Sequence, residues 1–493
     1  MKYLNDSPLD GETLLQQMDE MKKDDKDFRA GKTWNLVYHI SDEFDEFVMK
    51  AHNKFFAENY LNPMAFKSIK QMEHEVVKMG AELLGGDDKT VGVVTSGGTE
   101  SILLPCLAAR EMAAKKKPWI VRPNIVVPES IHVAFDKACK LFGLKKIVVP
   151  LEKDYTVCPK RIAKAINRNT VMVAASAPQY VHGVIDPIEE IGKVCLKKKI
   201  PFHVDSCIGG FVLPFMKMLG EEVPAFDLSV PGVTSISADL HKYGYTPKGN
   251  SLLLYKDMEY MKHQFYICTN WSGGVYVSPN LPGSRPGAPV AAAWATMKYL
   301  GLEGYLEQTK KIIDTKKRLI SGINEIADIE VVGNPNATLV CYKAKDNKKL
   351  PIFAVADQME KKGWYADRHQ KPESIHLTVM GTHFNCVEEF LDDLAEAVEI
   401  VKSNPSLGSQ GDAAMYGLIA KVPLKGMINK TVSKVMEGLY GPDSEIPDLS
   451  NVASDESEDP IMAFVGKHQE KVMQALDKVN EVTEKVKDFR HRL

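Results

Sequence analysis

The sequence has no apolar run long enough to span a bilayer, and its first residues, MKYLNDSPLDGETLL, contain no apolar signal core. Positive charge is not in excess either, because 62 Lys and Arg face 65 Asp and Glu, for a formal net charge of −3. This balance argues against nucleic acid or an anionic membrane as a main partner. The eight cysteines form no CxxC pair, which argues against a zinc site and a disulfide framework. We therefore expect a cytoplasmic protein without a bound metal.

What the sequence does have is alternation of strands and helices. Its 493 residues predict more than one structural unit. Residues 1–60 form a charged, helix-like N-terminal segment, and residues 61–303 alternate short β-branched runs with helical stretches. The runs are 92–97, 124–128, 146–151, 171–176 and 200–205. This pattern predicts an α/β fold with a mostly parallel sheet and helices on both faces, whose ligands bind at the carboxyl ends of the strands.

Two further units follow the large one. Residues 304–442 begin and end with helical stretches around three strand-like runs, which predicts a smaller C-terminal α+β domain. Residues 443–493 contain an acidic linker and then an amphipathic C-terminal helix with a heptad-like stripe from Val472 to Leu493. We expect this helix to pack on its own protein, and an intermolecular coil is the alternative.

The strongest chemical signal is SADLHKYGYTPKG, residues 237–249. Lys242 follows a histidine in a polar loop after a short strand, where burial and nearby cations would lower the pKa of its amine for attack on an aldehyde cofactor. Upstream, Asp205 ends the run IPFHVD, where a carboxylate could keep a pyridine nitrogen protonated. Each has a plainer interpretation, since most lysines only solvate and an Asp at a strand end can cap a helix. Together they predict pyridoxal phosphate (PLP) held by Lys242.

Three further features suit the same cofactor. In TSGGTES, Gly97 and Gly98 precede an apolar helix, so a phosphate could sit on the amides near Thr99, although a simple tight turn is the alternative. His132 follows the run NIVVP and could stack on a flat ring. His182 lies in a loop after the run 171–176 and could reach cofactor or substrate. Either histidine could equally be an ordinary core or surface residue.

These motifs, in this order, resemble those of the sphingosine-1-phosphate lyases, within the group II PLP-dependent decarboxylase family. The resemblance extends from about residue 12 to about residue 442 and includes TSGGTES, SIHVAFDKA, SAPQYVHGVIDP, HVDSCIGGF, SISADLHKYGYTPKG, WSGGVY and GSRPG. It implies fold type I, with a large PLP domain built on a seven-stranded sheet and a smaller C-terminal domain. It also implies a homodimer with active sites at the subunit interface.

The resemblance assigns roles to individual residues. Lys242 would be the Schiff-base lysine, Asp205 the partner of the pyridine nitrogen and His132 the stacking residue, with His182 or Lys242 as general base. The implied cofactor-binding residues are Gly97, Gly98, Thr99, His132, Ser176, Asp205, Cys207, His241 and Lys242, joined by Gly273 and Gly274 from the second subunit. The implied substrate-binding residues are Tyr38, Asn59, Asn62 and Lys248, of which Tyr38 and Lys248 would bind the substrate phosphate.

Three features depart from the family pattern. Asn62 stands where a histidine is usual, and an amide cannot make the stronger charge-assisted contact with phosphate. Ser272 stands where glutamine is usual, and the membrane-spanning segment of eukaryotic members is missing.

The expected activity is PLP-dependent carbon–carbon cleavage. A phosphorylated long-chain base would give a fatty aldehyde and phosphoethanolamine by a retro-aldol reaction. The alternative is a PLP-dependent L-amino-acid decarboxylase on the same fold. A third hypothesis, an inactive scaffold that binds a partner through its C-terminal helix, is disfavoured by the joint presence of Lys242, Asp205 and His132.

Overall fold

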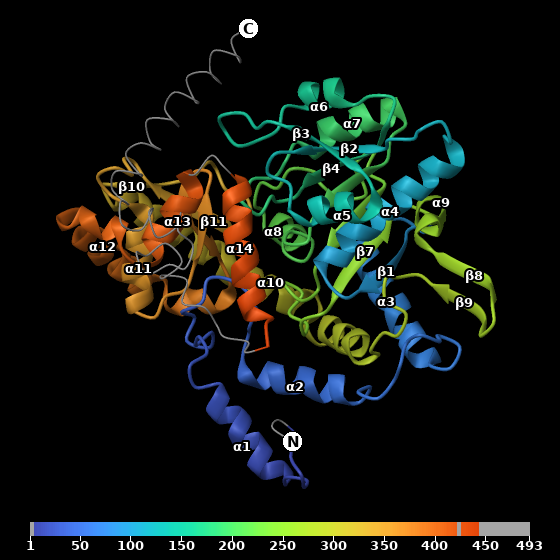
Figure 1. Cartoon of the computed structure of the whole chain (residues 1–493), viewed down its shortest axis with the longest axis horizontal. Helices are drawn as coiled ribbons and strands as arrows, with labels where there is room; N and C mark the ends of the chain where they lie inside the picture. Colours follow the sequence, from blue (N-terminus) through green and yellow to red (C-terminus); the bar gives the residue numbers. More distant parts are fainter. Residues whose placement is uncertain (1–3, 422–424, 443–493) are drawn as a thin grey trace.

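The computed structural model describes residues 4–421 and 425–442, so the predicted acidic linker and C-terminal helix of residues 443–493 lie outside the described residues. Two domains lie side by side in Figure 1, a larger one on the right and a smaller one on the left. In the N-terminal segment, helix α2 (Asp42–Asn53) lies along the underside of the molecule, and helix α1 (Gly11–Met21) projects below it. No helix in the described ranges is long and apolar enough to cross a membrane.

The larger domain is built on a seven-stranded sheet with the strand order β1-β7-β6-β5-β4-β2-β3. Only β7 runs antiparallel to its neighbours, β1 and β6, so the predicted mostly parallel sheet is confirmed. The run that forms β7 was not among the strands predicted from the sequence. The strands are β1 (Val91–Thr95), β2 (Asn124–Pro128), β3 (Lys145–Val149), β4 (Thr170–Ser176), β5 (Phe202–Asp205), β6 (Ser235–Ala238) and β7 (Ser251–Tyr255).

Helices cover both faces of this sheet, and the alternation of strand side chains explains how. In β2, Ile125 and Val127 pack in one apolar cluster, whereas Val126 packs in another on the opposite face. The first cluster includes α4 (Gly98–Lys116) and α5 (Ala134–Phe142). The second includes α3 (Lys67–Leu83), α6 (Pro159–Ala165), α7 (Ile188–Lys198), α8 (Leu213–Met218) and α10 (Ala288–Glu325).

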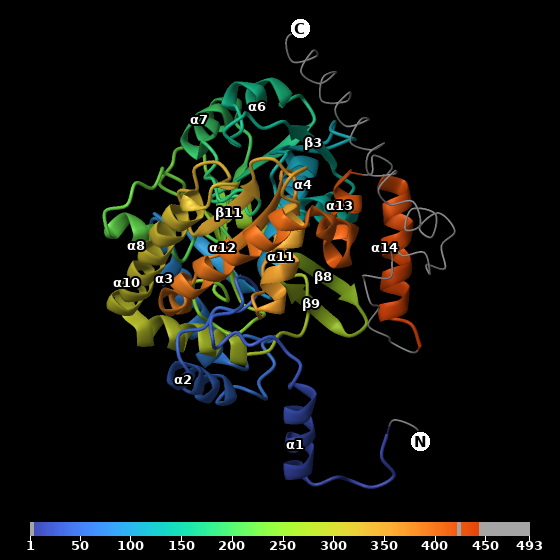
Figure 2. The same cartoon turned by 90° about the vertical axis from the view of Figure 1, so that its left-hand side faces the viewer.

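Helix α10 joins the two domains, and it bends at Gly301, whose φ of 55° and ψ of −168° are not helical. The bend lies close to the predicted boundary at residue 304. In the smaller domain a four-stranded sheet has the order β10-β11-β13-β12, and Figure 2 shows helices packed in front of it. Its elements are β10 (Ile329–Val331), β11 (Leu339–Ala344), α11 (Ile352–Lys361), β12 (Asp367–Gln370), β13 (Glu373–Thr378), α12 (Val387–Ser403), α13 (Gly411–Lys421) and α14 (Lys425–Leu439).

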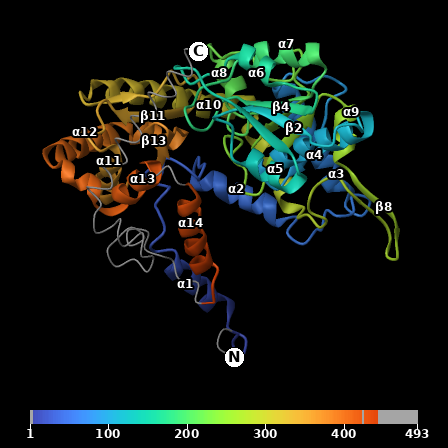
Figure 3. The ribbon, with the colours of Figure 1, turned by 45° about the horizontal axis from the view of Figure 1, so that its top comes forward.

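A two-stranded hairpin projects from the larger domain, away from the smaller one (Figure 3). It consists of β8 (Tyr266–Trp271) and β9 (Gly274–Ser278), and it follows the short helix α9 (Met258–Met261). Ile267 pairs with Val277 across the hairpin. Together with Val275 they form one apolar face, with side chains 55–71% exposed.

Candidate active site

The strand register aligns three of the site's polar residues. Ser176, at the end of β4, is level with Asp205, at the end of β5, and Asp205 is level with Ser237 in β6. All three are buried. Because the carboxyl ends of these parallel strands share one edge, the loops that follow them, including the turn with Lys242, meet there. This is the predicted location of the site.

Asp205 is held by a buried network. It is 6% exposed and accepts hydrogen bonds from the Cys207 N–H at 3.1 Å and from Ser237 Oγ at 3.4 Å. Ser237 Oγ also lies 3.3 Å from His203 Nε2. Burial lowers the pKa of His203 to about 4, so its ring is neutral at pH 7. His203 and Ser237 were not singled out from the sequence, although His203 lies two residues before Asp205 and therefore on the same face of β5.

The glycines of TSGGTES lie where a phosphate could bind. Gly97 has φ +145°, a conformation that side chains rarely adopt, and α4 begins at Gly98 without any side-chain cap on its first amides. A Cβ atom built on Gly97 would lie 3.5 Å from His241 Cε1, so the imidazole of His241 borders the same space. Gly97, Gly98, Thr99 and His241 therefore surround an anion-binding helix N-terminus.

Lys242 is paired with a carboxylate rather than surrounded only by cations. Its Nζ lies 3.0 Å from Asp239 Oδ2. Burial alone would lower the pKa of Lys242, but Asp239 outweighs it and raises that pKa above its ordinary value. The expectation of a lowered lysine pKa is therefore wrong for the chain without cofactor, because the sequence analysis overlooked Asp239.

Tyr38 and Lys248, the predicted phosphate-binding pair, are both brought to Lys242. Lys248 Nζ lies 4.9 Å from the centre of the Tyr38 ring and donates a hydrogen bond to the His241 carbonyl at 3.0 Å. The Lys248 side chain is still reached by solvent, but partial desolvation beside the site and then the charge of Lys242 lower its pKa to about 8. Burial raises the pKa of Tyr38 to about 12, although Lys242 opposes this rise. The pair thus provides one cation and one neutral hydroxyl.

The predicted site residues His132 and His182 differ in whether their rings are free to contact a cofactor or substrate. His132 is exposed after β2, and its Nδ1 accepts the Ala134 N–H at 3.2 Å, so its ring is fixed and one face can receive a flat group. His182 is buried and stacks on Tyr155. Its Nδ1 lies 2.8 Å from Gln179 Oε1 and its Nε2 lies 3.1 Å from the Lys371 carbonyl. With both nitrogens occupied, His182 is less suited than Lys242 to accept a proton from a substrate.

The remaining predicted residues divide into two groups. Ser176 and Cys207 are buried beside Asp205, where the Cys207 thiol donates to Ser237 Oγ at 3.3 Å. Gly273 and Gly274 instead lie at the turn of the β8–β9 hairpin. Asn59 and Asn62 are also exposed, and they accept hydrogen bonds from the Leu61 and Met64 N–H groups in their own loop.

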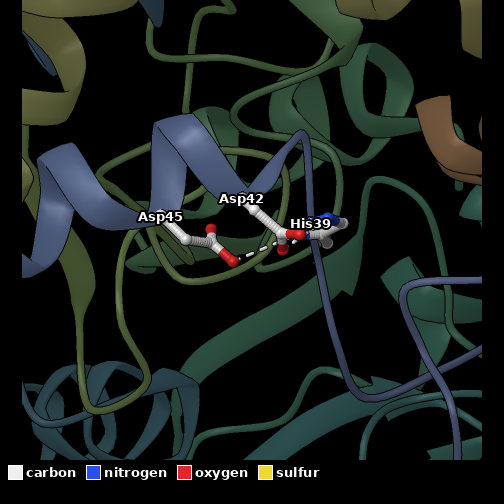
Figure 4. Close-up of side chains that lie close together, drawn as sticks. All are labelled: His39, Asp42 and Asp45. Atoms are coloured by element: carbon white, nitrogen blue, oxygen red, sulfur yellow. Dashed lines mark hydrogen bonds and ion pairs between the residues drawn. The ribbon is translucent and has the colours of Figure 1, made fainter.

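A group of possible metal ligands lies beside Tyr38, formed by His39, Asp42 and Asp45 (Figure 4). His39 Nδ1 is 2.9 Å from Asp45 Oδ2, and Arg29 Nε donates to Asp42 Oδ1 at 2.7 Å. Because Arg29 already pairs with Asp42, this group is an ordinary ion-pair cluster between the first turn of α2 and the residue His39 that precedes it. It fixes the extended segment that carries Tyr38.

The residues present fit PLP. The cofactor has a phosphate, a pyridine nitrogen and an aldehyde, and the site offers an uncapped helix N-terminus, the Asp205 carboxylate and the Lys242 amine. When bound, PLP supplies an electron sink for electrons released from a broken substrate bond. His132 would lie against the ring.

Comparison with known proteins agrees with this geometry. Residues 50–345 match the family model described as the pyridoxal-dependent decarboxylase conserved domain. The chain is 45% identical to a sphingosine-1-phosphate lyase of Arabidopsis thaliana, over 87% of this chain and 80% of that protein. The structure of a Burkholderia pseudomallei sphingosine-1-phosphate lyase superposes with a TM-score of 0.81 at 33% identity, over 89% of this chain and 97% of that one.

A Lactobacillus brevis glutamate decarboxylase superposes with a TM-score of 0.72 at 19% identity, over 81% of this chain and 94% of that one, which shows a shared fold alone. The expected fold type I architecture is thereby confirmed. On these grounds the chain belongs to the sphingosine-1-phosphate lyase family and is a PLP-dependent lyase.

Proposed function

We propose that the chain cleaves a phosphorylated long-chain base of the sphingosine-1-phosphate type into a fatty aldehyde and phosphoethanolamine. The main support for this proposal is that Tyr38 and Lys248 lie together beside Lys242. A lysine ammonium binds phosphate as a point charge, and a neutral phenol can donate to it. An amino-acid decarboxylase has no phosphate on its substrate to use such a pair.

Each residue then has a definite task. Asp205 would hold the proton on the pyridine nitrogen, and Gly97, Gly98, Thr99 and His241 would hold the cofactor phosphate. Tyr38 and Lys248 would hold the substrate phosphate, which orients the bond between the carbons bearing the amine and the hydroxyl. Lys242 Nζ would take the hydroxyl proton as that bond breaks and the hydroxyl carbon becomes the aldehyde. A proton then returns to the other carbon, which leaves in phosphoethanolamine.

The test is to incubate the purified chain with PLP and sphingosine-1-phosphate and to measure hexadecenal and phosphoethanolamine by mass spectrometry. Unphosphorylated sphingosine is the matched substrate control, and we expect little product from it. Carbon dioxide released from an aromatic or acidic amino acid, without hexadecenal from the lipid, would favour the decarboxylase alternative.

We also propose a homodimer with shared active sites. The β8–β9 hairpin projects from the domain, carries Gly273 and Gly274 at its turn, and exposes Ile267, Val275 and Val277. Exposed apolar side chains on one face of a hairpin favour burial against another chain. Sedimentation of the wild type should give a dimer, and Val275→Asp should shift it toward monomer with loss of lyase activity. A monomeric, fully active wild type would contradict this proposal.

The cytoplasm is our proposed location, because the eight cysteines are all free thiols, as expected in a reducing compartment. Fractionation of cells that express the tagged chain tests it, and recovery in the membrane pellet would contradict it.

A further inference from the structure

A carboxylate that the sequence analysis did not single out lies directly beside the Lys242 amine. Asp239 follows β6 and is 3% exposed. Its Oδ2 lies 3.0 Å from Lys242 Nζ and 3.6 Å from His241 Nε2. Its Oδ1 is buried, and the Ser251 side chain also stabilises the ionised carboxylate. An ionised carboxylate is costly to bury unless a cation is paired with it, so Asp239 and Lys242 depend on each other.

The surrounding backbone fixes this carboxylate. The Asp239 N–H donates to the Cys207 carbonyl at 3.1 Å, and the Lys242 N–H donates to the Asp239 carbonyl at 3.2 Å, so both side chains rise from one turn. On its other side the carboxylate lies against Gly98. A Cβ atom built there would be 2.6 Å from Oδ2 and 2.8 Å from Oδ1. Asp239 therefore lies between the start of α4 and the lysine.

The pair determines the protonation of both groups. Burial would raise the pKa of Asp239, but Lys242 and then His241 hold it below the ordinary value. The same carboxylate raises the pKa of Lys242, whereas partial desolvation lowers the pKa of nearby Lys248. Without cofactor, the chain therefore stores its aldehyde-reactive amine as an ammonium. Only an unprotonated amine attacks an aldehyde, so a proton has to leave Nζ first.

We propose that Asp239 is a positioning residue for Lys242, which orients the ammonium and sets the pH at which it gives up a proton for capture of the PLP aldehyde. Capture forms a carbon–nitrogen double bond between Nζ and the aldehyde carbon, and the aldehyde oxygen leaves as water. Of the three protons on the ammonium, two leave in that water and one stays on the nitrogen, so charge and atoms balance. The proposal does not depend on which substrate the enzyme cleaves.

The experiment uses the full-length chain stripped of PLP with hydroxylamine. Two matched variants each replace one carboxylate with its neutral isostere: Asp239→Asn, and Asp154→Asn in an exposed turn far along the chain. Acetic anhydride labelling of Lys242, followed by mass spectrometry, gives the pH midpoint of its reactivity. Stopped-flow absorbance gives the pH dependence of PLP uptake. For Asp239→Asn we expect both midpoints to fall by about one pH unit or more, because an opposite charge at this distance is removed.

Two outcomes would overturn the proposal: midpoints equal in Asp239→Asn and wild type, or slower PLP uptake with an unchanged labelling midpoint, which indicates a purely structural role. Asp154→Asn should match the wild type. If circular dichroism shows that Asp239→Asn does not fold, the wild type alone decides. Lys248 must then be labelled with a lower pH midpoint than Lys242, and the reverse order would refute the proposal.

Discussion

Lys248 couples substrate binding to pH at the scale of a single residue. Since partial desolvation lowers its pKa to about 8, it loses its positive charge as the pH rises through that value. We expect kcat/KM for a phosphorylated substrate to fall above about pH 8, because kcat/KM reports the free enzyme. Lys248→Met should lower kcat/KM by about 10–100-fold at pH 7, the size expected for one lost charge-assisted hydrogen bond.

Lys248→Arg serves as the control for charge, since an arginine stays protonated. Its kcat/KM should remain flat through pH 9. The assignment of Lys248 to phosphate binding is incorrect if Lys248→Met keeps the wild-type KM, or if the arginine variant keeps the fall near pH 8.

Lys242→Ala removes the amine that captures the cofactor aldehyde. We expect no visible absorbance band after incubation with PLP and no detectable turnover, while the fold is kept. Lys193→Ala, on the surface of α7 where it pairs with Glu189, should leave both readouts unchanged. Full activity of the Lys242→Ala variant would exclude the assigned role.

Much of the site was predictable at this scale because the chemistry sits in short motifs. Asp205 ends a strand, Lys242 and the glycines at 97 and 98 follow strands, and parallel strands bring their carboxyl ends together. Asp239 was inside a quoted motif and still missed, because only the turn between 239 and 242 makes the carboxylate face the amine. The spacing of residues in the sequence does not show which hydrogen bonds the rings of His132 and His182 make, and these decide whether each ring is free to bind a ligand.

At the scale of elements, the bend of α10 depends on one glycine. Gly301 has φ 55° and ψ −168°, and a Cβ atom there would meet nothing within 4 Å. Gly301→Ala should therefore destabilise the protein by about 1–3 kcal/mol through backbone strain alone, seen as a lower Tm. Gly438→Ala in α14, which also has open space around it but no positive φ, should leave Tm unchanged or raise it slightly. Equal Tm changes in the two variants would contradict this explanation.

Most elements were predictable from alternating β-branched runs and helical stretches, but the hairpin strands β8 and β9 were not predicted, and neither were β7 and β12. β7 is a five-residue run buried along its whole length, and such a run does not disclose whether it is a strand, or in which direction it lies. β12, DRHQ, is polar and gains its strand conformation from pairing with β13. In both β7 and β12, pairing with neighbouring strands determines the strand conformation.

For the whole molecule, buried histidines predict sensitivity to acid. Burial lowers the pKa of His203 to about 4 and that of His383 to about 3, whereas both titrate near 6.5 in an unfolded chain. The unfolded state therefore binds more protons below pH 6.5, and stability falls as the pH falls through that range. We expect Tm to decrease steadily from pH 7 to pH 5.

Asp186 has the opposite effect on the pH dependence of stability. Burial raises the pKa of Asp186 to about 7, so the native state binds its proton before the unfolded state does. Asp186→Asn removes this compensation, and the decrease in Tm between pH 7 and pH 5 should become steeper. An unchanged decrease would show that Asp186 stays ionised in the native protein over this pH range.

The N-terminal segment contacts both the smaller domain and the loop that carries Lys242. Trp34 pairs through its backbone with Tyr365 and Thr378 of the smaller domain and stacks on His383. Four residues later Tyr38 contacts Tyr243 in the loop of Lys242. The same short stretch of backbone therefore joins the smaller domain to the loop of Lys242, so a head group held by Tyr38 would lie on the connection between the two domains.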